Sequence, residues 1–209
     1  MSVISARLGA IVSDVGATMQ FREFDLRGAV EIRPNKHEDH RGYFSEVFRL
    51  NEFTEHAGQA DFVQDNQSLS VVTGTVRGLH FQSNPAAQGK LVRCIAGRLF
   101  DVAVDLRSGS PTYGRWLSVI LTPEEMNQLW IPVGFAHGFC SLEPNSIISY
   151  RCTEYYSPEH DLGVAWDDPD IGIDWPDVAD PETLSGKDRV QPSLAELPAY
   201  FTMENSRCA

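Results

Sequence analysis

The middle of the chain alternates between apolar and polar positions with the period of two that is typical of β-strands. Within 100–105, for example, apolar residues alternate with Asp101, Ala103 and Asp105. Segments of this kind are rich in β-branched and aromatic residues, and they span 62–72, 74–82, 90–106, 115–122, 127–142 and 146–156. Clusters of Gly, Pro, Ser and Asn separate them, as turns do. The pattern therefore predicts many short strands.

Helical periodicity is scarce, and two short stretches carry it, LNEFTEHAG (50–58) and TPEEMN (122–127). Short strands at regular spacing indicate a sandwich or barrel rather than β-α-β units. We therefore predict an all-β fold with a few short peripheral helices. The 209 residues fit one domain with tails. Because clear patterning runs from about Met19 to about residue 191, we expect a domain over 19–191 between an N-terminal tail (1–18) and a C-terminal tail (192–209).

Charge and cysteine content narrow the classes of function. The formal net charge of −12 argues against a nucleic-acid or anionic-membrane surface, because the phosphate backbone attracts basic patches. An anionic small molecule remains compatible if the few Arg and Lys residues converge on one site. The four cysteines form no CxxC pair and no zinc-like spacing, which favours free thiols in a reducing cytoplasm. The opening residues make a poor signal peptide, and no stretch is long enough to span a bilayer.

Candidate chemistry comes from polar residues inside the predicted strands. A single strand histidine or tyrosine is more often structural than functional, so the hypothesis depends on their combination. The combination comprises Arg77, His80, Gln82, Lys90, Arg93, His137 and Tyr150.

Part of this set follows the spacing of the two cupin motifs. The matching positions are Gly74, His80, Gln82 and Gly97 for the first motif, and Pro132, Gly134 and His137 for the second. Gln82 stands where a second metal-binding histidine would be, and Lys90 stands where the glutamate ligand would be. Two ligands are too few for a catalytic metal site, and a lysine repels a cation. We therefore expect no metal and no other cofactor.

Longer blocks carry a closer resemblance, from about Phe24 to Asp188. They are DHRGYFSEVF (39–48), FVQDNQSLS (62–70), VRGLHFQ (76–82), AQGKLVR (87–93), DVAVDLRSGSPTYGRW (101–116), WIPVGFAHGF (130–139), YRCTEYYSPEHD (150–161), WDDPDIGIDWP (166–176) and LSGKD (184–188). In this order they resemble the dTDP-4-dehydrorhamnose 3,5-epimerase family, which implies a cupin-type antiparallel β-barrel (jelly-roll). The departures are one extra residue between Asn66 and Arg77, and Asp161 where a glutamate is usual.

The resemblance implies an isomerase that inverts C3 and C5 of dTDP-4-keto-6-deoxyglucose in deoxysugar biosynthesis of the L-rhamnose type. Both carbons flank the C4 ketone, so the reaction needs a base, a donor at the enolate oxygen and an acid on the opposite face. By the resemblance, His80 is the base, Lys90 stabilises the oxyanion and Tyr150 is the acid. Asp188 is implied to orient His80, with Asp167 or Asp168 as the alternative carboxylate.

The resemblance also implies a set of substrate-binding residues: Arg41, Glu46, Gln64, Asn66, Arg77, His137, Asp161 and Lys187. Arg77 and Arg41 suit a diphosphate, and Arg41 is a candidate to reach across from a partner subunit. We accordingly expect a homodimer with exchanged N-terminal strands, for which the apolar GYFSEVF (42–48) is suited. In a regular strand Arg77 and His80 would point to opposite faces of the sheet. A bulge at Gly78 would place both on one face.

Three alternatives stay open at this point. One is an epimerase for a different dTDP-deoxysugar that acts at C3 only or at C5 only. The others are a metal-dependent cupin isomerase or dioxygenase, and a non-catalytic cupin that binds sugar nucleotides. The presence of Tyr150 favours the double epimerase, because inversion at two centres needs a competent acid.

Overall fold

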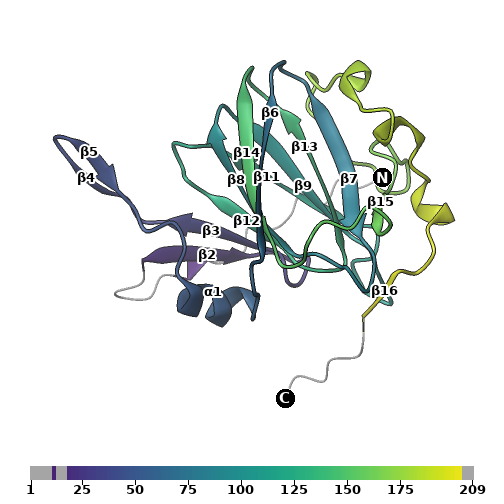
Figure 1. Ribbon diagram of the computed structural model, residues 1–209, viewed down its shortest axis with the longest axis horizontal. Helices are drawn as coiled ribbons and strands as arrows, with labels where there is room; N and C mark the ends of the chain where they lie inside the picture. Colours follow the sequence, from purple (N-terminus) through teal and green to yellow (C-terminus); the bar gives the residue numbers. More distant parts are fainter. Residues whose placement is uncertain (1–10, 13–17, 204–209) are drawn as a thin grey trace.

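The structure, a computed structural model, describes residues 11–12 and 18–203, which form two β-sheets packed face to face (Figure 1). The larger sheet has seven strands in the spatial order β1 (Ile11–Val12), β2 (Met19–Glu23), β3 (Val30–Pro34), β12 (Gln128–Ile131), β8 (Lys90–Ala96), β14 (Ser146–Cys152) and β6 (Gln64–Ser70). The smaller sheet has five, in the order β11 (Trp116–Leu121), β9 (Leu99–Asp105), β13 (Phe135–Ser141), β7 (Val76–Gln82) and β15 (Asp161–Gly163). Neighbouring strands in both sheets are antiparallel. The predicted all-β, cupin-type fold is confirmed.

Smaller elements surround the two sheets. They are the hairpin of β4 (His37–Asp39) and β5 (Gly42–Phe44), the parallel pair β10 (Arg107–Ser108) and β16 (Phe201–Thr202), helix α1 (Leu50–Ala57) and the 3-10 turns η1 (Pro181–Thr183), η2 (Asp188–Val190) and η3 (Leu194–Glu196).

Apolar residues from both sheets meet between them and form the main core. The seven-stranded sheet contributes Val92, Leu129 and Ile148, and the five-stranded sheet contributes residues such as Leu99 and Ala103. Burial of such side chains contributes about 25 cal/mol per Å² of apolar surface removed from water. Because this core fills only part of the space between the sheets, polar side chains occupy the rest.

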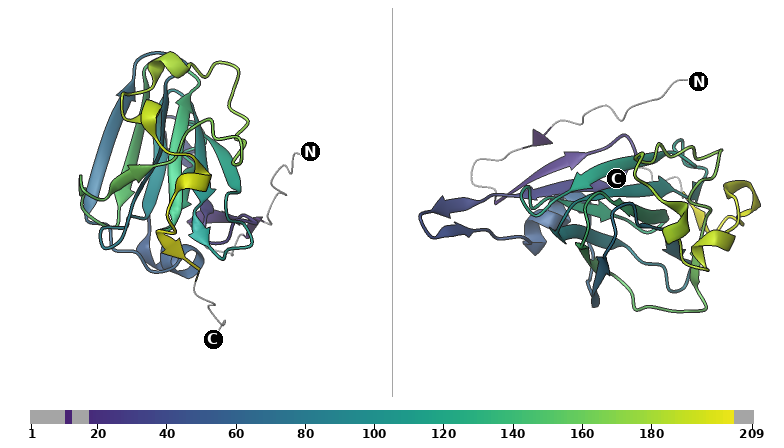
Figure 2. Two further views of the ribbon diagram at one scale, coloured as in Figure 1. Left: turned by 90° about the vertical axis from the view of Figure 1, so that its right-hand side faces the viewer. Right: turned by 90° about the horizontal axis from the view of Figure 1, so that it is seen from above.

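The five-stranded sheet is buried on its outer face as well. Val102 and Val104, which alternate with the inward residues of β9, pack there against Ile171, Leu194 and Phe201 of the C-terminal segment. In Figure 2 this segment runs along the outside of the sheet. Residues 194–202 therefore contribute to the packing, whereas the expected boundary at residue 191 stays a prediction.

The predicted helix 50–58 is confirmed as α1, whose Phe53 is fully buried against Trp130 on the outer face of the seven-stranded sheet. The helix predicted over 122–127 is wrong. This segment makes one turn, in which the Met126 amide donates to the Thr122 carbonyl, and it stops because Met126 adopts a φ of 55°. A left-handed residue cannot continue a right-handed helix.

The β4–β5 hairpin projects away from the two sheets (Figure 1) and exposes Tyr43 and Phe44. Among the residues the structure describes, no helix is long and apolar enough to cross a membrane. Cys94, Cys140 and Cys152 are free and buried, while Cys208 and the expected tail up to residue 10 lie outside the described residues.

Candidate active site

The inner face of the five-stranded sheet brings two histidines side by side. His80 on β7 and His137 on β13 are direct Cα partners in the antiparallel pairing. Directly opposed residues point to the same face of a sheet. Phe135 and Phe139, two residues to either side of His137, belong to the core between the sheets. Both imidazoles therefore face the space between the two sheets.

His80 is paired with a buried carboxylate. Its Nε2 lies 2.6 Å from Oδ1 of Asp188, a residue with 4% exposure at the start of η2. Burial alone would raise the pKa of Asp188, but hydrogen bonds from His80, Ser185 and the Gly78 amide together lower it below its usual value. Because this carboxylate stays ionised, Nε2 of His80 donates to it, and Nδ1 is the nitrogen left to accept a proton.

Asp188 is thus the partner of His80, as the sequence suggested, and neither alternative takes that position. Asp168 is buried elsewhere, where it accepts backbone N–H groups of Asp170, Ile171 and Leu194 and anchors the C-terminal segment. Asp167 is exposed.

A bulge in β7 places Arg77 on the same face as His80. His80 is opposite His137 and Arg77 is opposite Phe139, so β7 has one more residue than β13 between these two pairs. Gly78 allows this, since its φ is 112° and a Cβ there would lie 2.6 Å from Cα of Gly138. The Arg77 guanidinium crosses toward β6 and donates to the carbonyl of Leu69 at 3.1 Å.

The opposing sheet contributes Lys90 and Tyr150. Lys90 starts β8 opposite Cys152, and Tyr150 on β14 packs against the core between the sheets. Burial lowers the pKa of Lys90, whereas the charges of Asp161 and Asp101 raise it. Burial raises the pKa of Tyr150. At neutral pH the phenol therefore keeps its proton. Lys90 has no ion-pair partner within 4 Å among the described residues.

A row of polar groups leads from Lys90 toward the surface. The Asn66 amide contacts the Cys152 thiol, and the Gln64 amide donates to Asn66 Oδ1 at 3.0 Å. Gln64 Oε1 in turn accepts the Tyr156 amide at 2.9 Å. Two predicted nucleotide contacts, Gln64 and Asn66, are therefore held in place on the edge strand β6.

Asp161 and Lys187 form an ion pair at the rim. Lys187 Nζ lies 2.5 Å from Asp161 Oδ2, and the hydroxyl of the exposed Tyr156 donates to the same oxygen. Asp161 follows the loop after β14 and pairs with Gln82 on β7, whereas Lys187 directly precedes Asp188. The ion pair thus ties this loop to the turn that carries the partner of His80.

Two predicted site residues lie apart from this group within the chain. Arg41 is at the tip of the β4–β5 hairpin, where it pairs with Asp39 and its side chain is 78% exposed. Glu46 pairs with Arg49 just before α1. Among the contacts of the described residues, neither side chain makes a hydrogen bond or ion pair with the residues between the sheets.

Asp101 belongs to the group of side chains around His80 and His137, although the sequence analysis assigns it no role. Its Oδ1 lies 2.8 Å from Nε2 of His137, and the carboxylate is fully buried. The available signal was the acidic residue inside an apolar strand, on the same face as Ala103. A second histidine–aspartate pair therefore stands beside His80 and Asp188.

Gln82, at the position of a cupin metal ligand, is fully engaged with the backbone. Its amide donates to the carbonyls of Ala86 and Tyr155, and its oxygen accepts the Ser157 amide. Among the described residues, no group of three or more His, Cys, Asp or Glu side chains could hold a metal ion. The polar groups of Gln82 thus hold the backbone of neighbouring loops and are not available to bind a cation.

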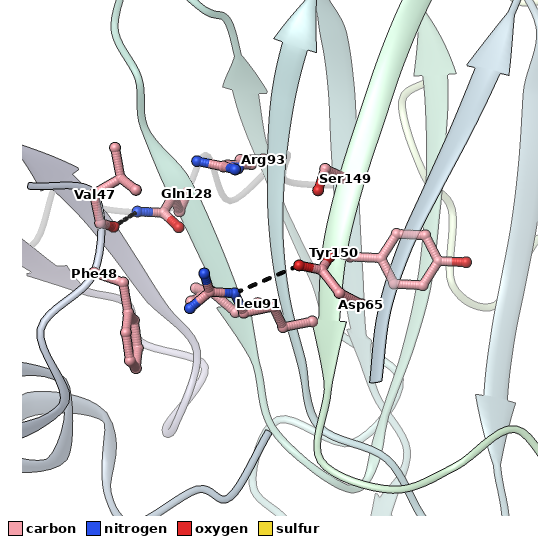
Figure 3. Close-up of a pocket in the computed structure, with 9 residues that line it drawn as sticks. Val47, Phe48, Asp65, Leu91, Arg93, Gln128, Ser149 and Tyr150 are labelled. Atoms are coloured by element: carbon pink, nitrogen blue, oxygen red, sulfur yellow. Dashed lines mark hydrogen bonds and ion pairs between the residues drawn. The ribbon is translucent and has the colours of Figure 1, made fainter. Parts of the chain in front are cut away.

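The hollow in Figure 3 is separate from this site. It lies on the outer face of β8 and β14, beside Arg93, Gln128 and Asp65. The Tyr150 ring points away from it in the figure, toward the five-stranded sheet. Tyr150 thus contributes its ring to the inner site and only its backbone to the hollow.

Known proteins resemble this chain in both sequence and fold. The family model for dTDP-4-dehydrorhamnose 3,5-epimerase matches residues 23–196. A dTDP-4-dehydrorhamnose 3,5-epimerase from Sinorhizobium fredii is 56% identical over 183 residues, which cover 88% of this chain and 93% of that protein. One from Methanothermobacter thermautotrophicus is 51% identical over 186 residues, covering 88% and 100%.

A solved structure gives the same result. The dTDP-6-deoxy-D-glucose-3,5-epimerase from Legionella pneumophila, in complex with dTDP-4-keto-L-rhamnose, superposes with a TM-score of 0.83 at 41% identity and covers 89% of this chain and 99% of its own. With the family model matching most of the sequence and the fold in agreement, the chain belongs to the dTDP-4-dehydrorhamnose 3,5-epimerase family.

Proposed function

We propose that the protein inverts C3 and C5 of dTDP-4-keto-6-deoxyglucose, by proton abstraction and reprotonation from the opposite face. The observation that carries this proposal is the pairing of His80 on the five-stranded sheet with Asp188 of η2, facing a site to which the other sheet contributes Lys90 and Tyr150. An enzyme that forms an enolate between two faces needs a base on one side and an acid on the other.

In the proposed mechanism His80 removes the proton next to the C4 ketone through Nδ1. The imidazolium that forms is stabilised by Asp188, whose low pKa keeps it ionised. The electron pair moves onto the ketone oxygen, where the Lys90 ammonium stabilises the negative charge in a largely dry site. Tyr150, kept protonated by its raised pKa, delivers a proton to the opposite face of the carbon, and the configuration inverts.

The diphosphate and nucleoside would lie beside these groups. Arg77 is exposed, reaches from β7 toward the edge strand β6 and offers a fork of donors for phosphate oxygens. Gln64 and Asn66 form the neighbouring edge, and Asp161 and Lys187 the rim. His137 completes the inner wall beside His80. We assign these residues to substrate binding.

We further propose that the active protein is a homodimer in which Arg41 and Glu46 of one subunit serve the site of the other. Support comes from the projecting hairpin, with Tyr43 57% exposed and Phe44 71% exposed. Exposed aromatic residues on a strand favour association with another surface. We place the enzyme in the cytoplasm, which the three free, buried thiols favour.

Solvent exchange tests the proposed reaction. The protein would be incubated in deuterium oxide with dTDP-4-keto-6-deoxyglucose, and each sugar carbon followed by NMR. We expect deuterium at both C3 and C5 and the appearance of the inverted product without added metal. Exchange at one carbon alone would identify a 3-only or 5-only epimerase, and no exchange at all would contradict an epimerase function.

A further inference from the structure

Asp101 is a buried carboxyl group that the proposed mechanism does not yet use. It lies on the inner face of β9 with 0% exposure, between the apolar positions Leu99 and Ala103. Its Oδ1 contacts His137 Nε2 at 2.8 Å, but its buried Oδ2 has no hydrogen-bond partner among the described residues. Burial of a carboxylate oxygen without a partner is costly. A structural carboxylate would be expected to have both oxygens satisfied.

Asp105, two residues farther along β9, shows what such a structural carboxylate looks like. It is also fully buried, but both of its oxygens are engaged, by Arg107, Ser110 and Thr112. The difference between the two aspartates points to a role for Asp101 in the site rather than in the packing of the strand.

The charges around Lys90 come from several elements. Burial lowers its pKa, Cys152 on β14, Asp161 on β15 and Asp101 on β9 raise it, and Lys187 before η2 lowers it. Burial raises the pKa of Cys152, so this thiol is neutral at pH 7.

The carboxylate of Asp161 is already paired with Lys187 at 2.5 Å. Among these groups Asp101 is therefore the carboxyl group with an unengaged oxygen. Burial raises the pKa of Asp101 above its usual value, although His137 and Lys90 act in the opposite direction.

His137 connects this carboxylate to the reaction. It stands directly opposite His80, and each imidazole contacts its own buried carboxylate through Nε2. Both histidines therefore present Nδ1 to other partners. A carboxylate on one nitrogen fixes the tautomer and the ring orientation of a histidine.

We propose that Asp101 is a positioning residue of the active site, which fixes the tautomer and ring orientation of His137 through Nε2. The expected effect on turnover rests on the proposed function, whereas the fixed tautomer of His137 does not depend on the reaction.

The substitution Asp101→Asn removes the charge and keeps the shape, and Asp105→Asn is the matched control on the same strand. We expect kcat to fall on the order of 10²-fold as His137 loses its orientation. Asp105→Asn should lower stability and leave kcat unchanged.

A double-mutant cycle with His137→Asn tests whether Asp101 acts through His137. Asp101→Asn in the His137→Asn background should cost little further kcat, because the residue acts on turnover through His137. Fully additive losses of kcat, or an equal fall in kcat for Asp101→Asn and Asp105→Asn, would overturn the proposal.

NMR of the wild-type protein labelled with 15N-histidine gives a readout that needs neither turnover nor a folded variant. We expect the His137 signals to show a proton on Nε2 throughout the range of pH stability. A neutral His137 protonated on Nδ1 alone would overturn the proposal even if Asp101→Asn does not fold. If the wild-type protein exchanges no deuterium into the keto sugar while His137 keeps its Nε2 proton, the proposed function fails and the positioning of His137 by Asp101 stands.

Discussion

At the scale of single residues, His80 and Tyr150 belong to opposite sheets, so their replacements should fail in different ways. His80→Asn should abolish both epimerisation and deuterium exchange, because no other side chain in the proposed site is assigned to remove the proton. Tyr150→Phe keeps the ring and its packing, and the enolate can still form through His80 and Lys90. Inversion should fall by about 10²–10⁴-fold, the usual loss for a general acid, while exchange falls much less.

The two readouts are measured together by NMR in deuterium oxide, with circular dichroism as the control for folding. In Tyr150→Phe, His80 reprotonates the enolate mainly on the face from which it removed the proton. Substrate that carries deuterium but keeps its configuration should therefore accumulate. Equal losses of exchange and inversion would mean that Tyr150 acts before or during proton abstraction, and the two-face assignment would be wrong.

Asp188 gives a pH dependence to stability as well as to activity. Its pKa is lowered in the folded state, so its stabilising contribution is present above the unfolded value of about 3.9 and is lost as the pH falls through the folded value. Asp188→Asn should lower the free energy of unfolding at pH 7 by about 1–3 kcal/mol. Between pH 5 and pH 3 the variant should lose less stability than the wild type.

Urea unfolding at several pH values measures this difference. Asp167→Asn replaces an exposed aspartate of the same C-terminal segment and serves as the control. Its unfolding free energy should change with pH as that of the wild type does. If the unfolding free energy of Asp188→Asn ran parallel to that of the wild type from pH 7 to pH 3, the His80–Asp188 pair would not hold its carboxylate ionised in the folded protein.

The residue types in the strands predicted much of the site. His80, His137, Lys90 and Tyr150 could be assigned inward positions because each stands in a strand with cupin spacing. Asp101 could not be assigned a role, since its alternation with apolar residues fits a buried or an exposed face equally well. Only the pairing of β9 with β13 reveals that His137 is its partner.

At the scale of elements, the bulge in β7 could be suspected but not established from the sequence. Alternation predicts opposite faces for Arg77 and His80, and Gly78 allows but does not require an extra residue. The register with β13 decides the matter, because tertiary pairing selects the bulge. The turn at 122–127 is another feature that composition does not reveal. Nothing in its residue types indicates that Met126 adopts a left-handed conformation, so the segment is predicted as a helix.

The bulge itself can be tested with Gly78→Ala. An alanine there must adopt a φ near 112° and would place Cβ 2.6 Å from Gly138 and 2.7 Å from the His137 carbonyl oxygen. We expect a loss of about 1–3 kcal/mol in unfolding free energy from the backbone alone, with more from the clash, and a large fall in kcat as His80 moves. Gly109→Ala is the control, because φ is 81° there but nothing lies within 4 Å of the added Cβ.

Denaturant unfolding of both variants separates backbone strain from crowding. Gly109→Ala should lose only about 1–2 kcal/mol, the usual penalty for a left-handed residue, with activity unchanged. If Gly78→Ala were as stable and as active as Gly109→Ala, the close approach of β7 and β13 would not be what positions His80.

At the scale of the whole molecule, one subunit does not bring every predicted site residue together. Arg41 is on the projecting hairpin (Figures 1 and 2), 78% exposed and paired only with Asp39 of the same turn. A single guanidinium in water contributes little through such a pair. Arg77 is exposed as well, but its guanidinium is held by Leu69 and Ser70 of β6. The proposed homodimer explains this difference if the hairpin enters the site of a second copy.

Mixing two inactive variants tests that exchange directly. Homodimers of His80→Asn lack the base, and homodimers of Arg41→Ala lack the exchanged arginine, so each alone should be nearly inactive. In a mixed dimer the Arg41→Ala subunit keeps its own His80 and receives Arg41 from its partner, which restores one complete site. Random exchange of subunits makes half of the dimers mixed, so activity should recover to about a quarter of the wild-type value. If Arg41 served the site of its own subunit, every site would lack one of the two residues and mixing would restore nothing; light scattering of the mixture, with wild type as reference, verifies that dimers are present.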